Sequence, residues 1–235
     1  MTENYYSSRR GQLLREFDDL AGRVRRVFVP RLGVGPTDEM IAETRREYDA
    51  LIPRVPYVGG KQPFTRFLIS TAQFLAMYRV LGRRGVSLEE AGELIYRICE
   101  EVMGSYPGFV LKILGGSNFS GRHIRDLRRR AEESQRRLYP GDYVYSFVEG
   151  DGEGFDYGVD YTECASVKFL EAEGAPELAP YLCLIDILYS ERFDWGLRRT
   201  TTLAEGGARC DFRFKRGGET RVASSVLRKG NPRMD

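Results

Sequence analysis

Histidine is nearly absent from this chain of 235 residues, which contains only His123. Multi-histidine metal centres are therefore excluded, and a Ser-His-Asp or Cys-His mechanism is weakened. His123 follows Ser120 near an expected helix start, where a capping or surface role is favoured over that of a general base. Any chemistry must rest mainly on other side chains.

The chain also lacks long apolar runs and a charge excess. No window approaches the ~20 apolar residues of a membrane span, and residues 1–12 lack the apolar stretch of a secretory signal. Its 36 Lys and Arg against 34 Asp and Glu give a formal net charge of +2, too small for general nucleic-acid binding. We expect a cytoplasmic protein that binds a small molecule, with no membrane and no nucleic-acid partner. A homo-oligomer is left open.

Cysteine is sparse, with four examples at Cys99, Cys164, Cys183 and Cys210. They show no CxxC spacing, and a chain of this length needs no disulfides to form a core, so we interpret them as free thiols. The last three make only a weak case for zinc, because their spacings are long. The sequence also lacks a P-loop, a GxGxxG turn, an HExxH helix and a GxSxG elbow. We expect neither a metal nor a cofactor.

Residues 1–140 are typical of helices. Apolar residues recur at helical spacing over residues 11–28, 37–51, 64–81, 88–102 and 120–138. Pro30 and the glycines after it should end the first helix, Thr37 should cap the second, and Ser87 with Glu90 should form a capping box. Residues 64–81 are apolar nearly all round, which predicts a central buried helix. Cys99 lies on an apolar stripe and is expected in the core.

After Pro140 the pattern changes to strands. Two β-rich runs at residues 143–149 and 155–162 predict a hairpin, and the second alternates aromatic with polar residues. Helical spacing returns over residues 164–188, broken near Gly174. Runs at 197–203 and 209–215 predict a second hairpin.

We therefore predict an α+β fold in one domain spanning residues 1–235. A helical part, residues 1–140, should cover an antiparallel sheet formed by a hairpin-helix-hairpin part, residues 141–216. Residues 217–235 form a polar tail that is expected to fray.

Three cysteines of the last third are candidate site residues. Cys164 follows the aromatic strand and should open a helix, whose dipole favours the thiolate; the alternative, a small buried residue, is about twice as favoured. Cys183 lies one helical turn before Asp186, so a carboxylate can sit beside that thiol. Cys210 shares its strand face with Phe212, and a core role is favoured for it alone. Because sequential elements usually pack together, at least two of these cysteines should meet in one pocket.

Asp186 lies on an apolar helical stripe, where an unpaired carboxylate is costly. Proton transfer in catalysis and a buried ion pair explain it equally well. The candidate partners for such a pair are Arg192, Arg198 and Arg199. At the other end of the chain, Gly59, Gly60 and Lys61 precede the central helix, where they can present N–H groups and an ammonium to a carboxylate, or form a plain turn.

Several segments resemble one known family, that of L-2-amino-thiazoline-4-carboxylic acid hydrolase. These segments are PYVGGK at residues 56–61, LGRRGVSLEE at 81–90, TEC at 162–164, YLCLID at 181–186 and RTTTLAEGGARCDFRF at 199–214. The resemblance implies ring-opening hydrolysis of a cyclic amidine to an N-carbamoyl amino acid such as N-carbamoyl-L-cysteine. The C-terminal segments are also similar to ligand-binding domains of the four-vinyl-reductase type, which implies a pocket between helices and sheet.

Together these lines suggest a hydrolase that opens a small cyclic amidine or thiazoline-like carboxylate at a C–N bond. The catalytic candidates are Cys164, Cys183, Asp186 and Cys210, and the substrate-binding candidates are Arg199, Thr202 and Lys61. A thiolate of Cys164 or Cys183 would attack the amidine carbon, Asp186 would protonate the leaving group, and Arg199 would hold the substrate carboxylate. Attack by water activated by Asp186 or by a cysteine-bound metal is the second mechanism. A non-catalytic ligand-binding or sensor domain is the alternative function.

Overall fold

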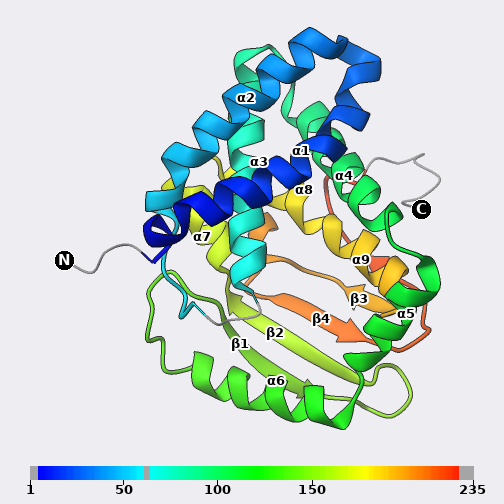
Figure 1. Cartoon of the computed structure of the whole chain (residues 1–235). Helices are drawn as coiled ribbons and strands as arrows, with labels where there is room; N and C mark the ends of the chain where they lie inside the picture. Colours follow the sequence, from blue (N-terminus) through cyan, green and yellow to red (C-terminus); the bar gives the residue numbers. More distant parts are fainter. Residues whose placement is uncertain (1–4, 61–63, 228–235) are drawn as a thin grey trace.

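The structure, a computed structural model, describes residues 5–60 and 64–227. Six α-helices occupy the first part of the chain, as predicted for an α+β fold with its helices first (Figure 1). They are α1 (Arg10–Leu32), α2 (Val34–Leu51), α3 (Thr65–Arg83), α4 (Leu88–Gly104), α5 (Gly108–Ser117) and α6 (Gly121–Ser134). Among the described residues, no helix is both long enough and apolar enough to pass through a membrane.

The predicted start of the second helix is wrong, and the predicted end of the first is right for its glycine but not for Pro30. Helix α1 continues past Pro30 to Leu32 and ends at Gly33, whose positive φ of 81° suits glycine. Helix α2 then begins at once, so Thr37 lies inside it rather than at its cap, and its hydroxyl donates to the Gly33 carbonyl at 2.7 Å. The capping box of α4 is confirmed on the Ser87 side, because the Ser87 hydroxyl accepts a hydrogen bond from the Glu90 N–H at 3.2 Å.

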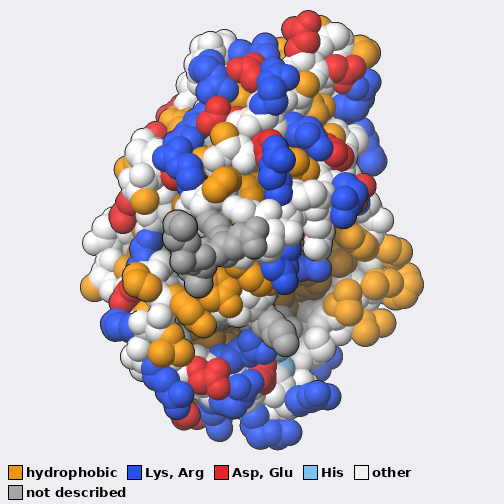
Figure 2. Space-filling model, turned by 60° about the vertical axis from the view of Figure 1, so that its left-hand side comes forward, with side chains coloured by type: hydrophobic (Ala, Val, Ile, Leu, Met, Phe, Trp, Pro, Cys, Tyr) orange, Lys and Arg blue, Asp and Glu red, His pale blue; other side chains and the backbone are white. Residues whose placement is uncertain are grey.

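The outer faces of α1 and α2 are joined by exposed ion pairs. Arg45 pairs with Asp18 at 2.7 Å, and Arg10 pairs with Asp49 at 2.5 Å. The upper part of the surface in Figure 2 accordingly shows basic and acidic side chains intermixed. Such exposed pairs add little stability each, but they leave the apolar stripes of the two helices to face inward.

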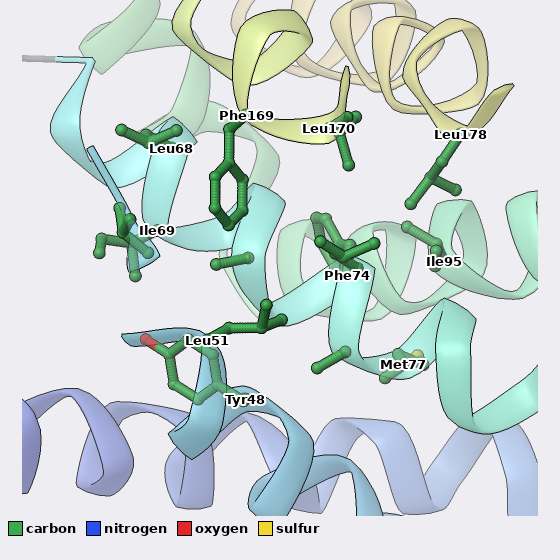
Figure 3. Close-up of a cluster of buried hydrophobic side chains, with 14 of the residues drawn as sticks. Tyr48, Leu51, Leu68, Ile69, Phe74, Met77, Ile95, Phe169, Leu170 and Leu178 are labelled. Atoms are coloured by element: carbon green, nitrogen blue, oxygen red, sulfur yellow. The ribbon is translucent and has the colours of Figure 1, made fainter. Parts of the chain in front are cut away.

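Helix α3 forms the centre of the core, as predicted. Leu68, Leu75 and Ala76 have no exposed surface, and Met77 retains 2%. Figure 3 shows Leu68, Ile69, Phe74 and Met77 of this helix between side chains of α2 below and of the segment 165–178 above. One cluster of buried side chains thus contains residues from both halves of the chain. Cys99 of α4 belongs to it with 6% exposure, which confirms its expected core position.

The sheet has five strands in the order β1-β2-β4-β3-β5. Their bounds are β1 Val144–Glu149, β2 Tyr157–Glu163, β3 Leu197–Arg199, β4 Cys210–Phe214 and β5 Arg221–Val222. Both predicted hairpins form, and β2 pairs with β4 so that Tyr161 lies opposite Cys210. Strand β5 pairs parallel to β3, so the sheet is mixed rather than purely antiparallel, and the expected frayed tail is ordered at this point.

Three helices connect the hairpins: α7 (Ala165–Ala172), α8 (Ala179–Cys183) and α9 (Ile185–Phe193). The break predicted near Gly174 is present, since that glycine has a φ of 71°. The sheet has two unlike faces, because Tyr157, Val159 and Tyr161 alternate with polar residues along β2. Asp160 on the polar face pairs with Arg213 at 2.7 Å. The aromatic face is therefore the one turned toward the helices.

Candidate active site

Cys164 lies where β2 gives way to α7, in the N-cap position of that helix. The backbone N–H groups of Ser166 and Val167 oppose the rise in its pKa, although the Cys164 side chain makes no capping hydrogen bond. Burial is the larger effect, and it raises the pKa of the Cys164 thiol. The lowered pKa expected from the helix dipole is therefore wrong, because desolvation of the thiolate outweighs the effect of the neighbouring N–H groups.

Asp186 lies in the first turn of α9, three residues after Cys183, which ends α8. Its carboxylate Oδ2 accepts a hydrogen bond from Arg199 Nη1 at 2.5 Å, and Arg199 Nη2 donates to the Cys183 carbonyl at 3.2 Å. Of the three candidate arginines, Arg199 is thus the partner. Its side chain has no exposed surface, whereas that of Asp186 retains 32%.

Cys210 begins β4 and is buried at 7% exposure. Its sulfur accepts a hydrogen bond from the Leu203 N–H at 3.2 Å. Burial raises the pKa of this thiol to about 11. The side chain is therefore a neutral thiol at physiological pH, as the core interpretation implies.

The structure brings these groups together. Burial raises the pKa of Cys183 well above its usual value, and the charges of Asp186, Cys164 and Cys210 raise it further, while Arg199 lowers it. The contacts agree, because Arg199 bonds both Asp186 and the Cys183 carbonyl, and Cys210 lies opposite Tyr161, three residues before Cys164. Cys164, Cys183, Cys210, Asp186 and Arg199 thus form one group, which we call the cysteine cluster. Within the described part of the chain, no three His, Cys, Asp or Glu side chains are arranged to hold a metal ion.

The cysteine cluster borders a recess inside the fold. Desolvation by surrounding protein is the first cause of the raised pKa of Cys164, Cys183 and Asp186, yet all three side chains keep accessible surface. These side chains are therefore not sealed in the core, and we call the space that they face the recess. Figure 2 shows a hollow bordered by hydrophobic side chains on one face of the molecule. Two depressions elsewhere, beside Glu101 and beside Gly22, contain no member of the cluster.

The other predicted substrate-binding residues are placed differently. Thr202 is buried, and its hydroxyl donates to Glu205 at 3.1 Å. It therefore holds the turn before β4, and contact with a substrate stays a prediction. Lys61 lies outside the described residues. His123 supplies a backbone N–H to the Ser120 hydroxyl at 3.2 Å, which is the expected capping arrangement.

A hydrogen-bonded group beside Cys164 was not predicted from the sequence. The Tyr143 hydroxyl lies 3.1 Å from the Ser166 hydroxyl, and Thr71 of α3 donates to Ser166 at 2.8 Å. Ser166 is also one of the two residues whose N–H groups oppose the rise in the pKa of Cys164. Its distant partners, Thr71 in α3 and Tyr143 just before β1, leave no sequence signal.

The comparison with known families agrees with this geometry. The family model described as L-2-amino-thiazoline-4-carboxylic acid hydrolase matches residues 66–214. The chain belongs to this family. The match begins in α3 and ends with β4, so it includes every member of the cysteine cluster. No curated protein and no solved structure matches the chain. The family resemblance seen in the sequence is thereby confirmed, and the family name indicates a hydrolase.

Proposed function

We propose that this family member opens the ring of a small cyclic amidine or thiazoline-like carboxylate and releases an N-carbamoyl amino acid type of product. The observation that carries the proposal is the meeting of three thiols with Asp186 and Arg199 at one recess. A thiol supplies a nucleophile for a carbon bound to two heteroatoms, and a neighbouring carboxyl supplies a proton.

Cys164 is the best nucleophile of the three. The pKa of Cys183 is raised well above its usual value, and that of Cys210 is raised to about 11. The N–H groups of Ser166 and Val167 and the ammonium of Lys168 all oppose the rise in the pKa of Cys164. These interactions stabilise a thiolate at the start of α7. Cys183 and Cys210 then form the walls of the recess.

Asp186 acts as the proton donor in this scheme. Burial raises the pKa of its carboxyl, and Arg199 only partly opposes the rise. The protonated acid is therefore present at higher pH than for an ordinary aspartate. Arg199 is already bonded to Asp186 and is wholly buried, so we assign it to positioning this carboxyl rather than to holding the substrate carboxylate.

The bond that breaks depends on the ring. The Cys164 thiolate adds to the amidine carbon, and the ring heteroatom leaves with a proton from Asp186. Water then adds to the same carbon, and the thiol of Cys164 leaves, which gives the carbamoyl group. In a thiazoline, the amidine carbon is bonded to the ring sulfur and to the ring nitrogen. An N-carbamoyl product forms when the bond from this carbon to sulfur breaks. The C–N bond expected from the sequence breaks only in a ring whose leaving atom is nitrogen.

A non-catalytic ligand-binding domain is the second candidate function. The raised pKa values of all three thiols favour it, because they mean that little thiolate is present without ligand. The resemblance to domains of the four-vinyl-reductase type points the same way and stays an expectation.

Turnover of 2-amino-thiazoline-4-carboxylate by matched cysteine variants tests the proposal. Cys164→Ser should lower kcat/KM by about 10²-fold or more, because an alcohol is a poor nucleophile at this carbon. Cys99→Ser is the control: Cys99 is a core thiol whose pKa is raised to about 12, so activity per folded molecule should be unchanged. Stoichiometric binding of this compound, with its recovery unaltered after long incubation with the folded wild-type chain, would favour the binding function instead. Equal activity of the two variants would favour attack by water.

A further inference from the structure

The recess has an aromatic wall, which we define as Phe64, Tyr143, Tyr161, Phe212 and Phe214. Phe64 packs against Tyr143 and Tyr161 with ring centroids 5.1 Å and 5.9 Å apart. Tyr161 lies edge-on to Phe212 at 5.5 Å, and Phe212 stacks on Phe214 at 6.0 Å. The rings come from the start of α3, from the residue before β1, and from β2 and β4, and these contacts join them into one cluster.

The aromatic wall adjoins the cysteine cluster. The charges of Cys164 and Asp186 contribute to the raised pKa of Tyr161, and the Arg199 guanidinium lies 5.3 Å from the centre of the Phe212 ring. Burial is the first cause of the raised pKa of Tyr161, yet this side chain and that of Phe212 keep accessible surface. These partly accessible rings therefore lie beside the proposed nucleophile.

A second aromatic group extends the wall outward. Phe67, one helical turn after Phe64, is 46% exposed, and its ring lies 6.2 Å from Phe64 and 6.3 Å from Tyr189 of α9. Burial also raises the pKa of Tyr189, and Asp186 contributes to the rise. An aromatic path thus runs from the surface at Phe67 to the cysteine cluster.

The charges beside the aromatic wall are matched. Asp186 and Arg199 neutralise each other, and the ion pairs of β2 and β4, such as Asp160 with Arg213, lie on the opposite face of the sheet. The described part of the recess therefore offers many ring faces and little net charge. A five-membered ring with one carboxylate would use few of these contacts.

We propose, on the basis of the proposed function, that the substrate is a cyclic amidine carrying an aromatic substituent. That ring would pack on Tyr161 and Phe212 while the amidine carbon reaches Cys164. Each aromatic contact adds affinity beyond the area that it buries. Two such contacts in the transition state predict a preference of about tenfold or more in kcat/KM for the aryl compound.

The test compares 2-amino-thiazoline-4-carboxylate with its 5-phenyl and 2-phenylamino derivatives. At least one derivative should exceed the parent compound in kcat/KM by about tenfold. Phe67→Leu and Phe212→Leu should reduce this preference more than they reduce turnover of the parent. Phe109→Leu is the matched control, because Phe109 is a 68% exposed phenylalanine on α5 outside the aromatic wall. Equal use of all three compounds by the wild-type chain would overturn the inference and leave the proposed function intact.

Binding gives an independent readout. Trp195, the single tryptophan, stacks on Phe193 at 4.9 Å and lies 6.1 Å from Phe214 at the end of the aromatic wall. Aryl compounds should change its fluorescence at concentrations about tenfold lower than the parent compound does. Binding of this kind without turnover of any compound would support the aromatic site and overturn the hydrolase. If no compound is turned over and the aryl compounds do not bind more tightly, both the hydrolase function and the aromatic site are overturned.

Discussion

Arg199 is a charged side chain with no exposed surface, and the carboxylate of Asp186 is its ionic partner. A buried guanidinium without a counter-charge is strongly destabilising, so Asp186 has a structural role whether or not it transfers protons. The raised pKa of Asp186 means that the folded chain binds this proton more tightly than the unfolded chain. This group alone therefore makes stability fall as pH rises from the unfolded pKa of ~3.9 through the higher folded value.

Replacing each member of this pair tests the structural role. Asp186→Asn should lower the free energy of unfolding by about 3 kcal/mol, near the lower end for buried pairs because Asp186 faces the recess. Arg199→Met should lower the free energy of unfolding by less, since Asp186 can take up a proton and become neutral. Denaturant unfolding of both variants and of the double variant measures the coupling.

The double variant should lose at least 1 kcal/mol less than the sum of the single losses. Strict additivity would show that the pair does not stabilise the fold. Turnover per folded molecule of Asp186→Asn separates the two roles, because a merely structural carboxylate would leave it unchanged.

At the scale of elements, sequence pattern predicted the helices that have an apolar and a polar side. It missed α5, because Gly108–Ser117 contains three glycines and no polar face. It also misplaced the start of α2 at Thr37, because the glycines after Pro30 favour a break, whereas Pro36 lies within the first turn of the helix. A proline there lacks only an N–H that has no partner within the helix, so α2 tolerates it.

Close approach between α4 and α8 positions Cys183, and it depends on Gly92. A Cβ atom at Gly92 would lie 2.2 Å from Cδ1 of Tyr181, two residues before Cys183. Gly92→Ala should therefore displace α8, lower stability by about 1–3 kcal/mol and lower turnover.

Gly22→Ala in α1 is the matched control for this close approach. A Cβ atom there meets nothing within 4 Å. Gly22→Ala should raise the free energy of unfolding by about 0.5–1 kcal/mol, because alanine loses less conformational freedom than glycine in a helix. Thermal melting and turnover of the two variants test the role of Gly92. Equal melting temperatures would show that the position of α8 does not depend on Gly92.

At the scale of the whole molecule, the site joins segments that are distant in the sequence. The meeting of Cys164, Cys183 and Cys210 follows from the order strand, helix, hairpin, in which sequential elements pack together. The choice of Arg199 over Arg192 or Arg198 as the partner of Asp186 was not predictable, because it depends on which strand residues face the helices. Phe64 lies 97 positions before Tyr161 along the chain, and periodicity carries no information about such a contact.

The single domain predicted from the sequence has a thermodynamic consequence. One cluster of buried side chains includes Phe17 of α1, Leu75 of α3, Val159 of β2 and Leu188 of α9. Neither part can unfold without exposing this shared core, so we expect one cooperative transition. At ~0.7 kcal/mol per residue near 60 °C, the unfolding enthalpy of the chain should be about 160 kcal/mol.

Calorimetry checks this expectation, because the calorimetric and van't Hoff enthalpies agree only in a two-state transition. Two probes report on different parts of the chain. The far-ultraviolet helix signal comes mostly from residues 10–134, whereas the fluorescence of Trp195 comes from the segment between α9 and β3. Coincident melting curves would support one domain. An earlier loss of either signal would mean that residues 1–140 and 141–216 unfold separately, and the recess would then lie between two domains.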